Sequence, residues 1–153
     1  MPLDREQLEA FLAEPRLAHL ATVSRTGRPS IRPVWFLWTE DAFWFTTRLQ
    51  ARRGGREMSA GSEVAVSIAS DERPYRAVLA TGTPQVWKQD VPAWLERIAV
   101  RYGEREGKNW LQRALAEPDR VVLRLVPDEL LTWDYGKGDS RRQAAGQSMR
   151  TAL

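Results

Sequence analysis

Apolar and polar residues alternate with a period of two over long parts of the chain, a pattern typical of β-strands with one buried face. Short turns rich in glycine, proline and acidic residues separate these segments, so consecutive strands are expected to be antiparallel. Gly82 is expected to place a bulge or bend in the longest segment. The pattern predicts strands over residues 17–23, 30–38, 42–47, 63–69, 75–88, 120–127 and 129–135.

Two segments show the helical period of 3.6 residues instead. Residues 4–14 predict one helix, with Asp4 as its N-cap. Residues 90–116 predict a second helix that Gly103 and Gly107 interrupt, followed by a further short helix before residue 118.

These elements place the chain in the mainly β (α+β) class. Six or seven antiparallel strands usually close into a barrel, because closure removes exposed sheet edges, and the helices would then cap its ends. We expect a single domain over residues 1–136. Residues 137–153 are polar and lack strong periodicity, so we expect a flexible C-terminal tail there.

The composition narrows the range of possible functions. The 153 residues include no cysteine and one histidine, which excludes disulfides, thiolate nucleophiles, iron–sulfur clusters and multi-histidine metal sites. That histidine, His19, lies on the first predicted strand without a carboxylate in the local pattern, so we favour a structural role over that of a general base. No apolar segment approaches the ~20 residues that span a bilayer, and the N-terminus does not resemble a signal peptide, so we expect a cytoplasmic protein without a membrane partner.

Aromatic residues are concentrated on the second and third predicted strands. Strand alternation points Trp35 to the face opposite Phe36 and Trp38, so one face forms core and the other exposes aromatic surface. We favour a homodimer interface there over burial of both faces by the later helices. A barrel that stacks single-stranded nucleic acid on tryptophans is a further alternative. It is disfavoured because the net charge is only +3 and acids nearly balance bases outside residues 48–56.

The segment TTRLQARRGGREM, residues 46–58, follows the third predicted strand and contains four arginines. One interpretation is a solvated basic loop. The other is an anion clamp, because threonine hydroxyls, N–H groups at a helix start and arginine side chains together form a good phosphate site.

The order LAHLATVSRTGRPSIRPVWFLWTEDAFWFTT, a basic crossover, then SEVAVSIASDERPYRAVLATGTPQV resembles the pyridoxamine 5'-phosphate oxidase-like superfamily of split β-barrels. The segment RVVLRLVPDELLTWDYGKGD, residues 120–139, resembles the closing strands of its flavin- and deazaflavin-dependent reductase branch. The resemblance covers roughly residues 5–139. It implies a six- to seven-stranded antiparallel split β-barrel with capping helices, and a homodimer with two cofactor sites at the subunit interface.

The resemblance also implies positions for the cofactor. The tricyclic ring would lie along the second strand, the phosphate would lie against the crossover, and Tyr75 would be an aromatic wall supplied by the partner subunit. The ring positions are Arg32, Pro33, Val34 and Trp35, and the phosphate positions are Thr46, Thr47, Arg52, Arg53 and Arg56. The family commonly has a lysine and, three residues later, an asparagine in this crossover, where this chain has Gly54 and Glu57. Arg53 is expected to replace the charge of the lysine.

The resemblance implies an oxidoreductase that uses a bound deazaflavin (coenzyme F-420) or FMN for hydride transfer to or from a small organic substrate. Deazaflavin is favoured because of the C-terminal pattern. The cofactor would perform the chemistry, so a chain with one histidine and no cysteine is sufficient. No catalytic residue is assigned. The alternative is a non-catalytic binding protein for flavin, a tetrapyrrole or another planar anionic ligand on the same barrel.

Overall fold

The structure, a computed structural model, describes residues 2–49 and 61–137. Over these residues the order and type of the elements follow the sequence pattern, and the fold is mainly β with three α-helices. In chain order the elements are α1 (Arg5–Ala13), β1 (Ala18–Val23), β2 (Pro29–Val34), β3 (Leu37–Thr39), β4 (Ala42–Arg48), β5 (Val64–Ala69), β6 (Arg76–Gly82), β7 (Gln85–Trp87), α3 (Val91–Ala99), the 3-10 turn η1 (Val100–Tyr102), α4 (Glu104–Leu115), β8 (Arg120–Leu125) and β9 (Glu129–Asp134).

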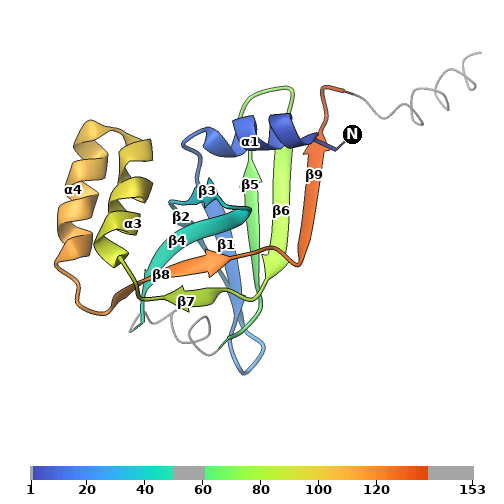
Figure 1. Ribbon diagram of the computed structural model, residues 1–153. Helices are drawn as coiled ribbons and strands as arrows, with labels where there is room; N and C mark the ends of the chain where they lie inside the picture. The colour runs from blue at the N-terminus through green and yellow to red at the C-terminus, as the bar shows by residue number, and fades with distance from the viewer. Residues whose placement is uncertain (1, 50–60, 138–153) are drawn as a thin grey trace, which may run out of the picture.

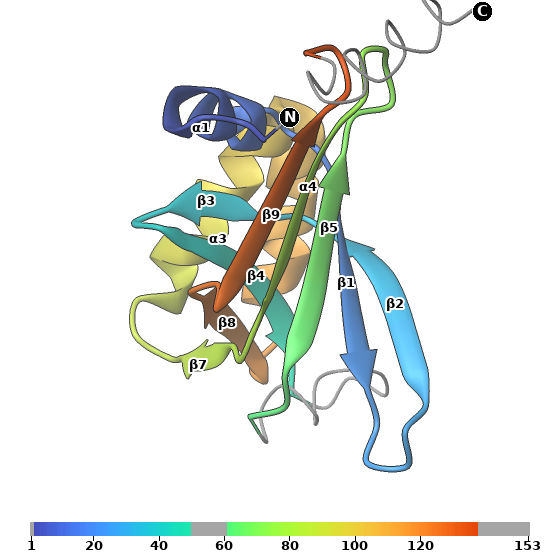
Figure 2. The same ribbon diagram turned by 90° about the vertical axis from the view of Figure 1, so that its right-hand side faces the viewer.

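The strands form two antiparallel sheets. One has five strands in the order β2-β1-β5-β6-β9, and the other has four in the order β3-β4-β8-β7. The sheets lie against each other, and the helices α3 and α4 stand side by side beyond the four-stranded sheet (Figures 1 and 2). Within the described residues the strands do not join into one continuously hydrogen-bonded barrel, so the barrel is split.

The main core fills the space between the two sheets and is closed at one end by α1 (Figure 1). Asp4 caps this helix as expected: the Gln7 N–H donates to Asp4 Oδ1 at 2.9 Å, and the Asp4 N–H donates to Gln7 Oε1 at 3.1 Å. The largest fully buried side chains of this core are Phe11, Leu12, Leu20, Phe36, Phe43, Phe45, Ile68 and Leu123.

The predicted strand over residues 30–38 is wrong in one respect, because the chain turns a corner in its middle. Residues up to Val34 pair with β1 in the five-stranded sheet, whereas Leu37 onward pairs with β4 in the four-stranded sheet. The N–H and C=O of Phe36, in the corner, bond to side chains of the helical region instead of a neighbouring strand. The predicted strand over residues 75–88 is likewise divided after Gly82, where a bulge or bend was predicted. Its two parts are β6 and β7.

The helical region also differs from its prediction at one glycine. Gly103 ends the first helical stretch with a φ of +91°, as expected. Gly107, in contrast, lies buried inside α4 and does not interrupt it. A Cβ at this position would lie 2.4 Å from the carbonyl oxygen of Ala99, so glycine is required here for close packing of α4 on α3.

The aromatic surface expected at a dimer interface is covered by these helices. Trp44 lies in a second core between the four-stranded sheet and the helices, where it stacks on Trp94 with ring centroids 3.6 Å apart. Trp35 stacks on Tyr102, also from the helical region. In the single chain the helices therefore cover much of this aromatic surface, and Trp35, Leu37 and Trp38 remain partly exposed.

Candidate functional site

A groove of about 420 Å³ lies where β2, β4, β8 and α4 meet. It brings together four residues that the sequence placed at the cofactor: two ring positions from β2, a third directly after β2, and one phosphate position from β4. Its lining residues are Leu17, Pro33, Val34, Trp35, Thr46, Trp110 and Arg120.

One wall of the groove is aromatic. The Trp35 ring stacks on Tyr102 with centroids 4.3 Å apart and planes only 4° apart. Trp110 approaches the same indole at 5.2 Å and 44°. Planar surfaces held in this way can bind a planar ligand at little entropic cost, because Trp35 is already fixed by its neighbours.

The orientation of Trp35 depends on two side chains that bind the adjacent corner. The Phe36 N–H donates to Tyr102 Oη at 3.0 Å, and the Tyr102 hydroxyl donates to the Arg16 carbonyl at 2.8 Å. Arg101 donates to the carbonyls of Phe36, Leu12 and Glu14. Burial lowers the pKa of Arg101 and raises the pKa of Tyr102. The guanidinium of an arginine stays protonated in proteins, and the raised pKa of Tyr102 keeps its hydroxyl protonated at neutral pH, so both keep the protons that these hydrogen bonds require.

Two arginines lie close together where β2, β4 and β8 meet: Arg120 lines the groove, and Arg32 on β2 lies near it without lining the groove. The Arg32 guanidinium donates to Thr47 Oγ1 at 3.0 Å, and Arg120 donates to Thr46 Oγ1 at 3.4 Å. The Thr46 hydroxyl in turn donates to the Val121 carbonyl at 2.7 Å. The threonines therefore hold the arginines in place.

Within the described residues, only one of these two arginines has a carboxylate partner. Glu117 forms an ion pair with Arg120, whereas Arg32 has no carboxylate partner in the described part of the chain. Burial, and then the charge of Arg120, lower the pKa of Arg32 from its ordinary value. A half-buried cation next to another cation is unfavourable unless an anion joins them, so this end of the groove is suited to an anionic group.

Three of the other predicted residues, Arg32, Thr47 and Tyr75, do not line the groove. Tyr75 precedes β6 and is 45% exposed, and its ring lies under the Arg73 guanidinium at 5.7 Å. It does not line the groove within one chain. Arg52, Arg53 and Arg56 lie outside the described residues.

Sequence analysis missed Arg120, Trp110 and Tyr102. Arg120 reaches the groove because β8 pairs with β4, with Arg120 opposite Arg48. This pairing joins positions more than seventy residues apart, for which the sequence has no local signal. Trp110 was assigned to a helix whose position on the barrel could not be predicted.

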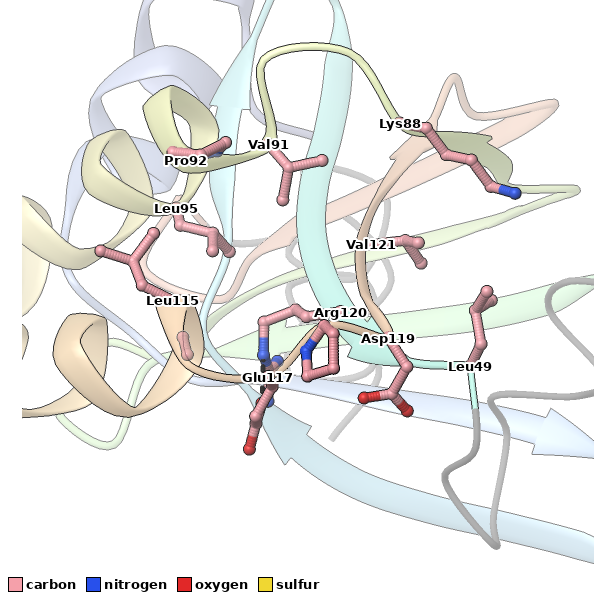
Figure 3. A pocket seen from close by; sticks show the side chains of 12 residues that line it. Leu49, Lys88, Val91, Pro92, Leu95, Leu115, Glu117, Asp119, Arg120 and Val121 are labelled. Atoms are coloured by element: carbon pink, nitrogen blue, oxygen red, sulfur yellow. Dashed lines mark hydrogen bonds and ion pairs between the residues drawn. The ribbon is translucent and has the colours of Figure 1, made fainter.

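Two further pockets adjoin the groove. One, of about 310 Å³, shares Trp35 and Trp110 with it. The other, of about 410 Å³, lies between the helical pair and β8 and shares Arg120 with it (Figure 3). In the latter pocket Val91, Leu95 and Leu115 form an apolar wall, and Glu117 lies beside Arg120 (Figure 3).

Other kinds of site were also considered. His19 is exposed on β1, outside the groove, and the described residues contain no cluster of histidine and carboxylate side chains suited to a metal ion. None of the helices in the described ranges combines the length and hydropathy needed to cross a membrane.

Two antiparallel sheets around a shared core, with an aromatic and cationic groove at their junction, define the molecule as a split β-barrel protein. The chain belongs to the pyridoxamine 5'-phosphate oxidase family, because the model of that family matches residues 4–134. No curated protein matches the sequence significantly.

Several solved structures share the fold. A protein named F-420 reductase is 26% identical, with a TM-score of 0.66 over 80% of this chain and 94% of that one. The heme storage protein HutZ of Vibrio cholerae is 21% identical, with a TM-score of 0.63 over 85% of this chain and 94% of that one. An FAD and heme binding protein of Mycobacterium smegmatis is 19% identical, with a TM-score of 0.63 over 94% of this chain and 78% of that one.

Proposed function

We propose that the protein is an oxidoreductase that uses a deazaflavin (coenzyme F-420) or FMN for hydride transfer to or from a small organic substrate. The observation that carries this proposal is the pair of arginines beside the aromatic groove. Arg120 lines the groove, and Arg32, which is close to Arg120 but not among the lining residues, is a half-buried cation without a carboxylate partner in the described chain. A cofactor with a planar ring and a phosphate is complementary to this site, because the ring matches the aromatic wall and the phosphate matches the positive charge of the arginines.

The residues present fit such a cofactor. Pro33, Val34 and Trp35 would hold the ring, and Arg32 and Arg120 would donate to the phosphate. The Thr46 hydroxyl already donates to a backbone carbonyl, so we assign it a positioning role and the phosphate contacts to the arginines. Arg52, Arg53 and Arg56, from the segment that follows β4, would add further positive charge.

The bound cofactor would supply the hydride chemistry. The protein would bind and orient the cofactor and the substrate, and it would exclude water. Arg32 would stabilise negative charge that develops on the ring or the substrate. The hydroxyl of Tyr102 is committed to backbone groups and its pKa is raised, so we do not assign it proton transfer. Tyr75 and Tyr135 are exposed and adjacent, with the Tyr135 N–H donating to the Tyr75 carbonyl at 3.0 Å, and we propose them as candidates for a proton donor.

Deazaflavin is the preferred cofactor for two reasons. The segment over residues 120–139 resembles the deazaflavin-dependent branch, and a protein named F-420 reductase shares the fold at 26% identity. Both reasons come from similar proteins and not from the groove itself, so FMN is tested in the same experiment as F-420.

We also propose that two copies pair through the outer face of the five-stranded sheet. No described helix covers this face (Figure 2), and it exposes Val23, Ile31 and Leu131 to between 46% and 67%. Along the five strands its outward positions include only two ionisable side chains, His19 and Glu129. An exposed apolar surface of this kind usually marks an interface.

This dimer would bring the partner subunit close to the cofactor groove. Pro33 is exposed on the same sheet face and also lines the groove. Tyr75 does not line the groove of its own chain, so a contribution to the cofactor site would have to come from the partner subunit.

The second candidate is a binding protein without redox turnover. Two of the similar structures are named as heme proteins, and a tetrapyrrole is also planar and anionic. His19, the one histidine, is exposed on β1 and does not line the groove, so a heme in the groove would need a different axial ligand.

Absorbance and fluorescence titrations of the purified protein with F-420, FMN and heme test the proposal. We expect micromolar or tighter binding of F-420 or FMN, and Arg32→Gln should weaken it by about tenfold to a hundredfold, the range for a lost hydrogen bond to a charged group. Arg28→Gln, which removes the same charge from an exposed turn, should leave affinity unchanged. Binding of neither redox cofactor would refute the oxidoreductase. Heme binding alone would establish the second candidate.

A further inference from the structure

The pocket of about 310 Å³ beside the cofactor groove is formed on one face of α4. Its lining residues are Trp35, Glu106, Asn109, Trp110 and Arg113. The four residues from α4 are spaced at i, i+3, i+4 and i+7, which places them in one row along the helix. Gly107 and Ala114 are buried on a different face of the same helix, whereas in this row Trp110 is partly buried and Glu106, Asn109 and Arg113 are exposed.

The pocket and the cofactor groove share both Trp35 and Trp110. A ligand in the pocket would therefore contact the same two indoles as a cofactor ring in the groove. The two rings are 5.2 Å apart and inclined at 44°, and Trp35 is backed by Tyr102, so the aromatic wall is fixed in advance. Such walls favour a planar molecule, and the volume lies near the lower limit of ~300–1,000 Å³ for small-molecule pockets.

The pocket carries opposite charges at two separate positions, Arg113 and Glu106, so it favours one orientation of a charged ligand. Arg113 and Glu106 are seven residues apart, about 10 Å along the helix, so they are too distant to form an ion pair with each other. In the described part of the chain neither has another ion-pair partner. Arg113 is thus available to bind an anionic oxygen group, Asn109 can add a hydrogen bond, and Glu106 repels an anion placed the other way round.

We propose that this pocket is the substrate site and that it takes a small planar molecule with a carboxylate or similar anionic oxygen group directed at Arg113. The inference rests on the proposed function, because it takes the adjoining groove as the cofactor site. It makes Arg113 a specificity-determining residue that acts on the substrate, whereas Arg32 and Arg120 act on the cofactor.

The experiment compares 2-naphthoate with its neutral analogue 2-naphthamide by isothermal titration, in the protein with and without bound cofactor. We expect 2-naphthoate to bind more tightly than the amide. Arg113→Gln should weaken naphthoate binding by about tenfold and leave naphthamide binding unchanged, because only the charged hydrogen bond is lost. Arg105→Gln removes the same charge from an exposed position on α4 outside the pocket, so it should have no effect.

Cofactor affinity separates this inference from its main alternative, an anionic cofactor tail in the pocket. We expect Arg113→Gln to leave F-420 and FMN affinity unchanged, and a loss equal to that of Arg32→Gln would overturn the assignment to the substrate. Absence of naphthoate binding, or binding unaffected by Arg113→Gln, would also overturn it. The arm without cofactor remains informative if neither redox cofactor binds, so the two proposals can fail separately.

Discussion

At the residue scale, the corner between β2 and β3 depends on two side chains, Arg101 and Tyr102, for which the described residues provide no acidic partner. Arg101 satisfies its charge with three backbone carbonyls, and Tyr102 uses one hydroxyl both to accept from Phe36 and to donate to Arg16. These bonds replace ladder hydrogen bonds that a continuous strand would have made. Removing either side chain leaves buried backbone groups without partners, which is more costly than losing a surface contact.

Tyr102→Phe is expected to destabilise the protein by about 1–3 kcal/mol at neutral pH, because the ring stacking remains but the hydroxyl bonds are lost. Burial raises the folded-state pKa of Tyr102 above the ordinary value of 10.0. The stabilisation is therefore complete below pH 10 and declines as pH rises through the raised pKa, because the unfolded chain loses the proton first. Urea unfolding of both proteins at neutral pH and above pH 10 measures the difference.

The wild-type advantage over Tyr102→Phe should thus become smaller above pH 10. Tyr135→Phe is the matched control, since Tyr135 is 67% exposed, and it should behave as the wild type at every pH. An advantage that stays constant with pH would contradict the burial of the Tyr102 hydroxyl.

At the scale of elements, the pair α3 and α4 determines the shape of the site. It supplies Trp110, Tyr102 comes from the turn between the two helices, and together they cover the aromatic strands. The two helices approach closely at Gly107, where the Ala99 carbonyl occupies the space of a side chain. A change at this contact should therefore affect both stability and the groove.

Gly107→Ala tests the close approach. An alanine in a helix is normally more stable than glycine by about 1 kcal/mol. Here the added Cβ would overlap the Ala99 carbonyl, so we expect a net loss of about 1–3 kcal/mol in the free energy of unfolding. Lys108→Ala, at an exposed position of the same helix, should stay within about 0.5 kcal/mol of the wild type. A gain in stability for Gly107→Ala would show that the helices are not in contact there.

Sequence reasoning predicted elements better than it predicted their contacts. The alternation of apolar residues and the Asp4 cap are local signals, and they located the strands and the first helix correctly. The break at Phe36 depends on Arg101 and Tyr102, which are more than sixty residues away along the chain, so the local pattern still indicated a single strand. Gly107 was misassigned for the same reason, because its need for space arises from tertiary packing.

The candidate site shows the same division. Pro33, Val34, Trp35 and Thr46, which the resemblance assigned to the cofactor, line one groove, because the resemblance encodes the topology of a known fold. Arg120 and Trp110 belong to segments whose position on the barrel no local pattern indicates.

At the scale of the whole molecule, the uncovered face of the five-stranded sheet is the surface available for a second copy. Helices cover the outer side of the four-stranded sheet, whereas no described helix lies over the five-stranded one (Figure 2). Ile31 is 67% exposed on this face. It pairs with Ala21 of the neighbouring strand β1, so it lies among small and apolar neighbours.

Ile31→Glu is expected to convert a dimer into a monomer, because two carboxylates would be buried at the interface. Sedimentation velocity at micromolar concentration measures the mass of each species. Val100→Glu, at a position 74% exposed on the helical side, should leave the mass unchanged. A wild-type protein that is monomeric under these conditions, or a dimeric Ile31→Glu variant, would contradict the proposed interface.

The corner at Phe36 also bears on the order in which the protein is made and folded. Its bonds join positions 66 and 89 residues apart, and such distant pairings generally form late because long loops must close first. A chain still on the ribosome has the outer face of the aromatic strands uncovered until the helical pair has been synthesised. Cofactor capture should therefore follow completion of the chain through Arg120, since a nascent chain that ends earlier lacks one wall of the groove.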